Sequence, residues 1–543
     1  MKKIQQKFIF VVGGVLSGVG KGVTTASLGA IFKAKGMRVT ALKIDPYVNI
    51  DAGTMNPIEH GEVFVTDDRD ETDQDMGNYE RFLDVDLDSN SYMTTGRVYL
   101  TVIENERAMK YKGRCVQVVP DVPKEVIRRI ETAAKKYQAD ITMIEVGGTV
   151  GEYENILFLE AGRMMKLANP DDVAFVLVSY LPIPAHLGEM KTKPTQHAAR
   201  ALNSVGINPD VIIARGEQAL DKPRLEKLAI FCGVKPDNCI SAPDVPSIYQ
   251  IPLTLEEQNL GNKLLKIFKL KSRTTNLKPW RDFVNRIDSS TREVKIAVVG
   301  KYFGTGNYTL ADSYHSVIEA IKHAAWFHKV KPVLEWIDSE EFEANDHAVE
   351  KLKNYDGIIV PGGFGTRGIE GIIRTIQFAR EHKKPYLGLC YGMQLATIEF
   401  ARNVLGKKQA HTVEVNPKTP DPIIHINPVQ AKNVKTNRYG GTMRLGAYDC
   451  ALRHGTKTAL AYGTDFISER HRHRYEFNND YREELDKAGL EVVGINPETD
   501  LVEIVELSGH PFFVGTQFHP EFKSRPMRPH PLFRDFMRAA LKK

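Results

Sequence analysis

Short runs of apolar residues alternate with amphipathic segments along most of the chain. The runs in the first half cover residues 8–12, 37–44, 140–146, 172–181 and 210–215, and a second series covers 293–300, 355–363 and 384–390. Unbroken runs rich in β-branched residues are typical of parallel strands that are buried on both faces of a sheet. The segments between them carry apolar residues at helical spacing. The alternation therefore predicts α/β architecture in both series.

A polar and basic segment, roughly 270–293, separates the two series. Pro279 stands in it where a helix can begin, and apolar residues follow at helical spacing, namely Trp280, Phe283, Val284 and Ile287. This pattern indicates a short helix that packs on a domain. We predict two doubly wound α/β domains with parallel sheets, 1–270 and 294–543, joined by an ordered linker, 271–293.

Composition narrows the class of protein. The 543 residues are 42% hydrophobic and 26% charged, as in ordinary soluble proteins, and length alone allows two to four domains. A net charge of +5 is small for this size, so we expect no nucleic-acid partner. The five cysteines are widely spaced and form no C-x-x-C pair, which favours a reducing cytoplasm. No run of 18 apolar residues predicts a membrane span.

The stretch GGVLSGVGKGVTT, residues 13–25, follows the first apolar run. It departs at two points from the phosphate-binding pattern G-x-x-x-x-G-K-[ST]. Val15 replaces the first glycine, and Gly22 replaces the hydroxyl residue that normally holds magnesium. The N–H groups of such a turn and the amine of Lys21 suit phosphate oxygens. We predict nucleotide binding here, with a plain strand-to-helix turn as the alternative.

Carboxylates elsewhere in the chain must replace the missing magnesium ligand, since magnesium prefers hard oxygen donors. Asp73 and Asp75 alternate in an acidic segment and would face one way if it were extended, although by itself such a segment is more often a solvated loop. Glu145 ends a buried run just before two glycines, where ligands gather in open α/β sheets. Lys43 and the loop 189–197 add positive charge, which points to more than one polyphosphate.

The stretch YLGLCYGMQLA, residues 386–396, has the arrangement of a nucleophile elbow, with Cys390 as the nucleophile at the start of a helix. In QFHPEF, His519 and Glu521 are two residues apart, so the carboxylate can orient the imidazole toward the thiol. The N–H groups of Gly363 and Tyr391 are candidate donors to an oxyanion. Together these residues predict an amidase that works through a thioester.

These motifs occur together in one family, and the chain resembles CTP synthases from end to end. The matching stretches are GGVLSGVGKG, KIDPYVNIDAGTMNPIEHGEVFVTDD, ETDQDMGNYERF, EVGGTVGEYEN, GEMKTKPTQH, PGGFGTRG, GLCYGMQ, RHRHRYE and QFHPEF. The resemblance implies an amidoligase domain like dethiobiotin synthetase, followed by a class I glutamine amidotransferase domain. It also implies a ligase that forms a C–N bond: ATP phosphorylates the 4-oxygen of UTP, and ammonia released from L-glutamine displaces that phosphate to give CTP.

The resemblance carries roles to individual residues. ATP would be bound by Gly18, Val19, Gly20, Lys21, Gly22, Val23, Lys43 and Asp75, with Pro243, Asp244 and Val245 near the adenine. UTP or the inhibitor CTP would be bound by Ser17, Glu152, Tyr153, Glu154, Lys191, Thr192, Lys193, Pro194, Thr195, Gln196 and Lys227. Glutamine would be bound by Gly363, Tyr391, Gly392, Met393, Gln394, Glu414 and Arg474, and Mg²⁺ by Asp75 and Glu145.

The family also implies a homotetramer with UTP sites at subunit interfaces, activation by GTP and inhibition by CTP. Phe364 and Arg367 are candidates near the GTP effect, and His60 and Val63 correspond to residues near a passage for ammonia. Two alternatives remain at this stage. One is a regulatory P-loop ATPase with an inactive amidotransferase-like module, and the other is an amidotransferase that acts on a carboxylate.

Overall fold

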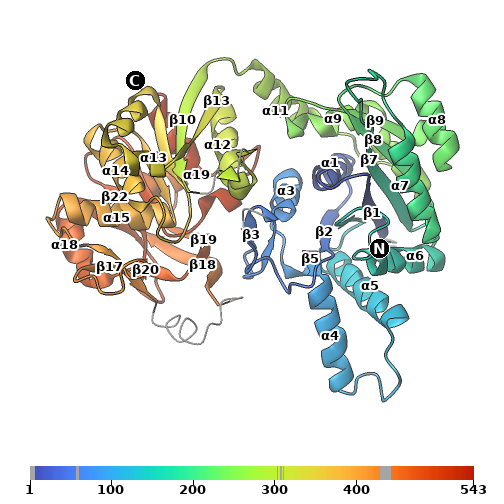
Figure 1. Ribbon diagram of the computed structural model, residues 1–543, viewed down its shortest axis with the longest axis horizontal. Helices are drawn as coiled ribbons and strands as arrows, with labels where there is room; N and C mark the ends of the chain where they lie inside the picture. The colour runs from blue at the N-terminus through green and yellow to red at the C-terminus, as the bar shows by residue number, and fades with distance from the viewer. Residues whose placement is uncertain are drawn as a thin grey trace. The chain divides into compact units, whose positions relative to one another are not determined.

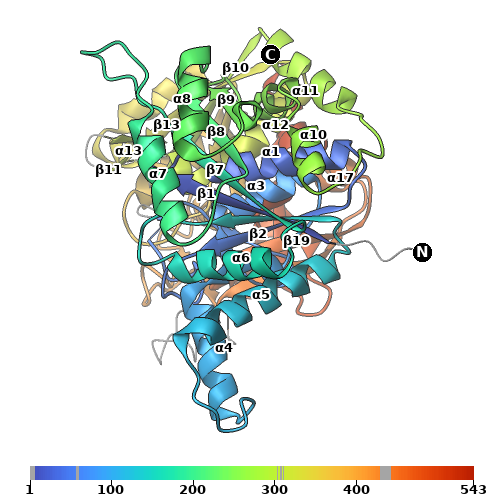
Figure 2. The same ribbon diagram turned by 90° about the vertical axis from the view of Figure 1, so that its right-hand side faces the viewer.

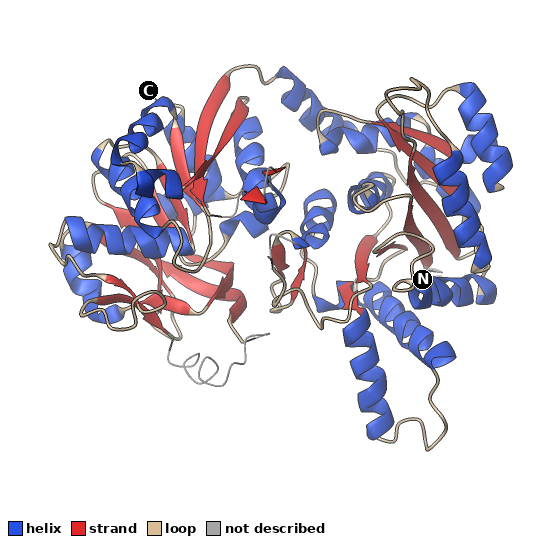
Figure 3. Ribbon diagram, viewed as in Figure 1, coloured by secondary structure: helices blue, strands red, loops and turns tan. Residues whose placement is uncertain are grey.

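The computed structural model of the chain describes residues 6–56, 60–301, 304–305, 308–309, 311–427 and 442–542. Its contacts divide the chain into two compact units, the first of residues 1–52 and 75–284 and the second of residues 53–74 and 285–543. Each unit contains a large sheet with helices packed on it (Figures 1 and 3). The α/β fold class predicted from the apolar runs is confirmed. The domain limits at 270 and 294 stay a prediction.

The sheet of the first unit has seven strands, and every neighbouring pair in it is parallel. All five predicted runs form strands of this sheet. Their side chains are buried on both faces, which is why the runs show no alternation of apolar and polar residues. In spatial order the strands are β5 (Tyr92–Thr94), β2 (Val39–Asp45), β6 (Ile141–Val146), β1 (Lys7–Gly14), β7 (Val173–Tyr180), β8 (Val211–Gly216) and β9 (Cys239–Pro243).

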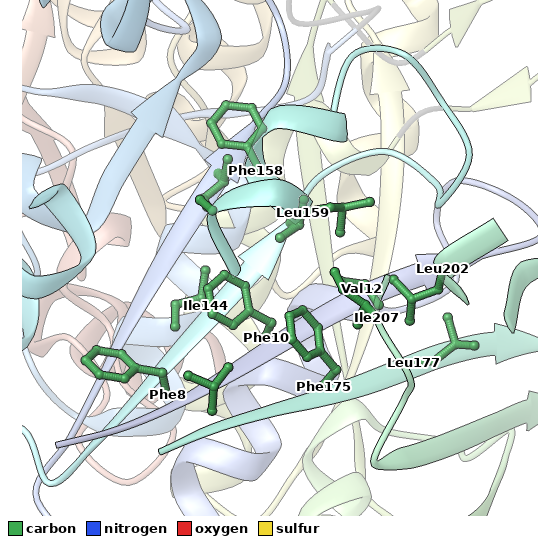
Figure 4. Close-up of a cluster of buried hydrophobic side chains, with 14 of the residues drawn as sticks. Phe8, Phe10, Val12, Ile144, Phe158, Leu159, Phe175, Leu177, Leu202 and Ile207 are labelled. Atoms are coloured by element: carbon green, nitrogen blue, oxygen red, sulfur yellow. The ribbon is translucent and has the colours of Figure 1, made fainter. Parts of the chain in front are cut away.

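Helices cover this sheet, as Figure 2 shows for β1, β2, α1, α5 and α6. On one face, Phe10 of β1 stacks on Phe175 of β7 with ring centroids 5.1 Å apart, and Phe158 and Leu202 come from the covering helices (Figure 4). Burial of each such side chain contributes about 1.5–3 kcal/mol. The helices are α1 (Lys21–Ala34), α3 (Gln74–Leu83), α4 (Thr95–Arg107), α5 (Val118–Lys136), α6 (Ile156–Ala168), α7 (Lys193–Ser204), α8 (Lys222–Cys232), α9 (Ile251–Glu257) and α10 (Leu260–Ile267).

The sheet of the second unit has nine strands and is mixed. It is parallel from β13 to β23 and antiparallel from β23 to β19, a difference from the predicted all-parallel sheet. The reason is the short connection between successive strands such as β21 and β22, which leaves no room for a crossover helix. In spatial order the strands are β13 (Lys331–Asp338), β10 (Glu293–Gly300), β14 (Gly357–Val360), β15 (Tyr386–Leu389), β23 (Phe513–Thr516), β22 (Val502–Leu507), β21 (Leu490–Ile495), β18 (Arg444–Leu452) and β19 (Phe466–His473).

Smaller elements complete the second unit. A hairpin of β3 (Val63–Val65) and β4 (Glu71–Asp73) comes from the N-terminal part of the sequence but belongs to this unit. Further strands are β11 (Gly304–Thr305), β12 (Tyr308–Thr309), β16 (His411–Thr412), β17 (Pro422–Ile426) and β20 (Tyr475–Phe477). The helices are α12 (His315–Phe327), α13 (Glu340–Ala344), α14 (Ile369–Glu381), α15 (Tyr391–Asn403), α17 (Lys457–Tyr462), α18 (Arg482–Lys487) and α19 (Pro531–Ala540).

The helix predicted in the linker forms as α11 (Lys278–Ser289). Its Trp280 is buried, and the indole N–H donates to the carbonyl of Tyr249 at 2.7 Å. Phe82 and Tyr249 pack around the indole ring. The linker segment is therefore ordered, as the spacing of its apolar residues predicts. Among the described residues, no helix is long and apolar enough to span a membrane.

Candidate active sites

The phosphate-binding loop connects β1 to α1, as the sequence predicts. Gly18 and Gly20 have φ angles of +74° and +89°, a left-handed backbone that glycine adopts without strain. The ammonium of Lys21 donates to the carbonyl of Gly148 at 2.9 Å. Burial lowers the pKa of Lys21, although the carboxylates of Glu145 and Asp75 act in the opposite direction. A lysine held in this way is placed to receive the charge of a phosphate.

Gly22 leaves room for a carboxylate in this loop. A Cβ atom at Gly22 would lie 1.9 Å from Oδ1 of Asp75, a distance at which no side chain fits. Asp75 therefore occupies the space that a serine or threonine would need at position 22. It lies in the first turn of α3, while Asp73 lies in β4. The two carboxylates do not share one extended segment, because the chain changes from strand to helix between them.

Lys43 lies between the carboxylates of Asp75 and Glu145 and pairs with both. The Lys43 Nζ lies 2.6 Å from Asp75 Oδ2 and 3.2 Å from Glu145 Oε1. Lys43 and Glu145 are paired in register on neighbouring parallel strands, β2 and β6, which brings their side chains to one sheet edge. The hydroxyl of Tyr79 also donates to Glu145.

The charges of these groups depend on one another. Burial raises the pKa of Glu145, and the nearby charge of Asp75 raises it further. Burial would also raise the pKa of Asp75, but the ammonium of Lys43 outweighs it and holds that pKa below the usual value. Glu145 is buried and Asp75 is partly buried, and these two carboxylates, which share Lys43, form an acidic pair with hard oxygen donors. This donor set, and the space at Gly22 that Asp75 fills, fit a magnesium ion.

The predicted adenine segment lies beside the same loop. Asp244 accepts from the guanidinium of Arg215 at 2.8 Å, and its N–H donates to the carbonyl of Gly216. A Cβ at Gly20 would lie 3.4 Å from that guanidinium. Arg215 thus connects the end of β9 to the phosphate-binding loop. The roles of Pro243, Asp244 and Val245 in binding stay predictions.

Part of the predicted UTP site is joined to the end of β7. The hydroxyl of Ser179 donates to that of Thr195 at 2.8 Å, and the amide of Gln196 donates to Thr192 Oγ1 at 3.1 Å. Ser17 is exposed in the phosphate-binding loop. The remaining residues are on the surface: Lys191 pairs with Glu189, Glu152 accepts from Thr149, and Tyr153, Glu154, Lys193 and Lys227 are exposed. In the described part of the chain, no hydrogen bond or ion pair joins Tyr153 or Lys227 to the other residues that are predicted to bind UTP or CTP.

Cys390 lies at the strand-to-helix turn that the sequence predicts, between β15 and α15. Its backbone has φ 50° and ψ −95°, a conformation that costs a residue with a side chain about 1–3 kcal/mol. The turn closes tightly because Gly392 lies against β14: a Cβ there would be 2.3 Å from the carbonyl of Val360. The turn places the thiol at the start of α15.

His519 and Glu521 lie beside this thiol. The imidazole Nδ1 is 2.7 Å from Glu521 Oε1, and the segment after His519 forms a 3₁₀ turn over Pro520–Lys523. Burial alone would lower the pKa of His519, but Glu521 and Cys390 outweigh it and raise the pKa to about 10. A Cβ at Gly362 would lie 2.9 Å from His519 Cε1 and 3.9 Å from Cys390 Cβ. The arrangement suits proton exchange between a thiol and an imidazole.

The loop 362–367 and its neighbours form the rest of this site. Glu414 accepts from the N–H of Gly365 at 3.0 Å, and the hydroxyl of Tyr391 donates to the Gly365 carbonyl at 3.0 Å. Gln394 donates to the carbonyl of Tyr475, and Arg474 donates to the hydroxyl of Thr442 at 3.0 Å. Gly363 and Met393 belong to the same two segments as Gly365 and Gln394.

Sequence reasoning missed Lys301 in this site. Its ammonium donates to the Gly365 carbonyl at 2.8 Å and lies 4.5 Å from the centre of the Tyr391 ring. Burial lowers the pKa of Lys301 to about 8, against the opposite effect of Glu414. Its place directly after the apolar run 293–300, at the carboxyl end of a parallel strand, is the signal that could have identified it.

Comparisons with known proteins identify the family of the chain. A family model described as the CTP synthase N-terminus matches residues 7–270, and one described as glutamine amidotransferase class-I matches residues 309–539. CTP synthase from Carboxydothermus hydrogenoformans is 51% identical over 99% of each chain, and that from Pyrococcus furiosus is 50% identical over 98% of each. The glutaminase domain of Trypanosoma brucei CTPS with bound acivicin is 40% identical over 46% of this chain and 94% of its own, with a TM-score of 0.42. The chain belongs to the CTP synthase family.

Proposed function

The chain is a ligase of the CTP synthase type, which makes CTP from UTP with glutamine as nitrogen donor, and we propose that its two sites divide this reaction between them. The observation that supports this division is the presence of two separate groups of reactive side chains. One group has phosphate-binding character and contains Lys21, Lys43, Asp75 and Glu145. The other has a thiol, an imidazole and a carboxylate in contact.

In the second unit, Cys390 attacks the amide carbon of glutamine. His519 holds the proton from the thiol, since Glu521 stabilises the imidazolium, and the pKa of His519 near 10 keeps that proton on the ring at neutral pH. The N–H groups of Gly363 and Tyr391 stabilise the oxyanion. The C–N bond then breaks, the amine leaves as ammonia with the proton from His519, and water hydrolyses the thioester to glutamate. Glu414 and Arg474 bind the amino-acid end of glutamine.

In the first unit, Lys21, Lys43 and the backbone of 18–23 bind the phosphates of ATP. Asp75 and Glu145 would hold Mg²⁺, which would neutralise charge on the phosphoryl group that is transferred. The 4-oxygen of UTP takes this group, and ammonia then attacks C4 while phosphate leaves. Ser17, 191–196 and Lys227 orient UTP, and 243–245 contact the adenine. The 152–154 segment belongs to the site at which CTP inhibits.

Assembly and regulation extend this proposal. The chain forms a homotetramer in the cytoplasm, is activated by GTP and is inhibited by CTP. Support for assembly comes from apolar side chains on and after α4 that are exposed in the single chain, namely Leu100, Ile103 and Met109. Exposed apolar side chains in one region favour association.

No observation favours a purely regulatory ATPase, since a binding module has no need for the bonded His519–Glu521 pair. The experiment is product analysis with UTP, ATP, magnesium and L-glutamine. We expect CTP, ADP, phosphate and glutamate in equal amounts. Formation of ADP and glutamate without CTP would contradict the proposal, and conversion of a carboxylate substrate in place of UTP would support the other amidotransferase class.

A further inference from the structure

The β3–β4 hairpin lies on the unit that contains Cys390, although it precedes it by more than 300 positions in the sequence. Both strands are fixed by charged contacts. The carboxylate of Glu62, just before β3, accepts from the N–H of Ser316 at 2.9 Å, at the start of α12. On β4, Glu71 pairs with Arg472 at 2.8 Å. Glu62 and Glu71 are buried, so neither contact is a screened surface pair.

The turn between the two strands fits closely against β18 and β19. The carbonyl of Asp67 accepts from the N–H of Ala447 at 3.0 Å. A Cβ at Gly446 would lie 2.7 Å from that carbonyl oxygen and 2.6 Å from Cγ of Arg69. Gly446 also has a φ of +84°, so a side chain there would be strained as well as crowded. The turn occupies a space that only glycine at 446 leaves open.

Two paths of contact lead from this hairpin to His519. In the first, Asp67 pairs with the guanidinium of Arg470, whose side chain is fully buried, and the carbonyl of Arg470 accepts from the N–H of His519 at 2.8 Å. In the second, Phe64 lies edge-on to Phe522 at 5.0 Å between ring centroids. Phe522 in turn stacks on the imidazole of His519, with centroids 5.2 Å apart and an angle of 25° between the planes.

We propose that Phe64 and Asp67 are positioning residues of the glutaminase, which hold the imidazole of His519 in place through Phe522 and Arg470. The inference rests on the proposed role of His519. His519 has three supports: Glu521 at Nδ1 of the ring, Phe522 on the face of the ring, and the carbonyl of Arg470, which accepts from the backbone N–H of His519. Phe64 contacts Phe522, and Asp67 contacts Arg470. The amidase site is therefore completed by residues from the N-terminal part of the sequence.

The expected effect is on the rate of the chemical step. A displacement of about 1 Å at a reacting group costs up to roughly 100-fold in rate. Phe64→Leu removes the edge contact behind Phe522 but keeps an apolar side chain. Asp67→Asn removes the charge that Arg470 needs but keeps the shape. We expect kcat for glutamine hydrolysis to fall about 10- to 100-fold in both variants while KM changes little, since neither residue touches glutamine.

The matched control is Asp68→Asn, which removes the same charge one position further along, where the side chain is exposed. A second measurement is the pH profile of Cys390 alkylation by iodoacetamide. In Phe64→Leu and Asp67→Asn this profile should differ from that of the unaltered protein, because a displaced imidazole exchanges a proton with the thiol less readily. Asp67→Glu should restore part of the rate. A purely structural role would leave this profile unchanged.

Gly446→Ala tests the same inference while both side chains stay in place, since the new methyl group pushes the turn away from β18. We expect the same fall in kcat and the same change in the alkylation profile, with ammonia-dependent CTP synthesis retained. Wild-type kcat and alkylation profiles in the three variants would overturn the inference. A Cys390→Ala variant that still hydrolyses glutamine would instead overturn the proposed function.

Discussion

The missing side chain at Gly22 determines where the carboxylates of the phosphate site can lie. Even a methyl group at position 22 would collide with the carboxylate of Asp75. Asp75 then meets Glu145 through Lys43, and the two carboxylates come from segments 70 residues apart in the sequence. On the proposed function, residues that only the fold brings together compensate for the departure from the common motif.

At the residue scale we predict the effect of Asp75→Asn. The variant keeps the size of the side chain but removes the charge that pairs with Lys43 and that would hold magnesium. CTP synthesis should fall at least about 100-fold, roughly 2.7 kcal/mol, with glutamine and with ammonia alike. The measurement is the initial rate of CTP formation at fixed magnesium. Glu104→Gln, an exposed carboxylate on α4, is the control, and normal activity in Asp75→Asn would move the metal elsewhere.

A second residue-scale prediction concerns Cys390→Ala. Without the thiol no thioester forms, so glutamine-dependent CTP synthesis should be abolished. Ammonia-dependent synthesis should remain largely intact, because the phosphate site lies in the other unit of the chain. Both rates are measured on the same preparation. The buried cysteine Cys450, replaced by serine, serves as the control for loss of a thiol. Loss of both activities in a folded Cys390→Ala protein would contradict the division of labour.

A third prediction uses the pH dependence of His519. Glu521 is the main group that raises the pKa of this imidazole to about 10. In Glu521→Gln that pKa should fall, so the imidazolium loses its proton at lower pH. The alkaline limb of kcat/KM for glutamine hydrolysis should therefore move to lower pH, with a lower plateau. Glu483→Gln, on the surface of the same unit, should leave the profile unchanged. An unshifted alkaline limb would mean that Glu521 only holds the loop.

At the scale of elements, the strands could be predicted because a strand that is buried on both faces has an unbroken run of apolar residues in the sequence. The runs 140–146 and 172–181 form β6 and β7 within one residue at each end. The hairpin β3–β4 could not be predicted in this way. Its two strands have three residues each, too few for a period, and Glu62, Asp67 and Glu71 read as solvated charges until their partners Ser316, Arg470 and Arg472 are known. Contacts over hundreds of residues leave no local pattern.

The start of β6 gives a prediction at this scale. The carboxylate of Asp140 accepts from the N–H of Arg38 at 2.9 Å, from its guanidinium at 3.0 Å, and from Arg273 at 2.7 Å. Burial would raise the pKa of Asp140, but the two arginines hold it at about 2. Asp140 thus ties β6 both to the start of β2 and to the segment that leads to α11.

Because the pKa of Asp140 is lower in the folded protein than in the unfolded chain, its contribution to stability is present above about pH 4 and is lost as the pH falls toward 2. The arginines are half exposed, so we expect about 1–2 kcal/mol. Asp140→Asn should lower the Tm by roughly 2–6 °C at neutral pH and reduce its fall in acid. Differential scanning calorimetry measures both, with the exposed Asp282→Asn as control. If the Tm of Asp140→Asn fell as steeply in acid as that of the unaltered protein, other carboxylates would be responsible for the loss of stability.

At the scale of the whole molecule, the proposed function places the two chemistries in separate units, so that ammonia has to pass from one to the other. Ammonia released into neutral water becomes ammonium, which has no lone pair with which to attack C4 of UTP. An enclosed path with little water keeps it neutral. The predicted residues near this path, His60 and Val63, belong to the segment 53–74, where His60 Nε2 lies 3.7 Å from Asp73 Oδ2 and Val63 is buried in β3. Their role in passage stays a prediction.

We therefore predict that nitrogen from glutamine reaches CTP without mixing with the solution. The measurement supplies amide-labelled glutamine with a large excess of unlabelled ammonium, at a pH where free ammonia is scarce, and follows the label in CTP by mass spectrometry. Enclosed transfer gives CTP with little dilution of the label. The Cys390→Ala protein, which should accept only external ammonia, defines the fully diluted limit under the same conditions. If CTP from the unaltered enzyme carried the label only in the proportion set by the bulk pool, ammonia would have to cross through water, and the separation of the two sites would need another explanation.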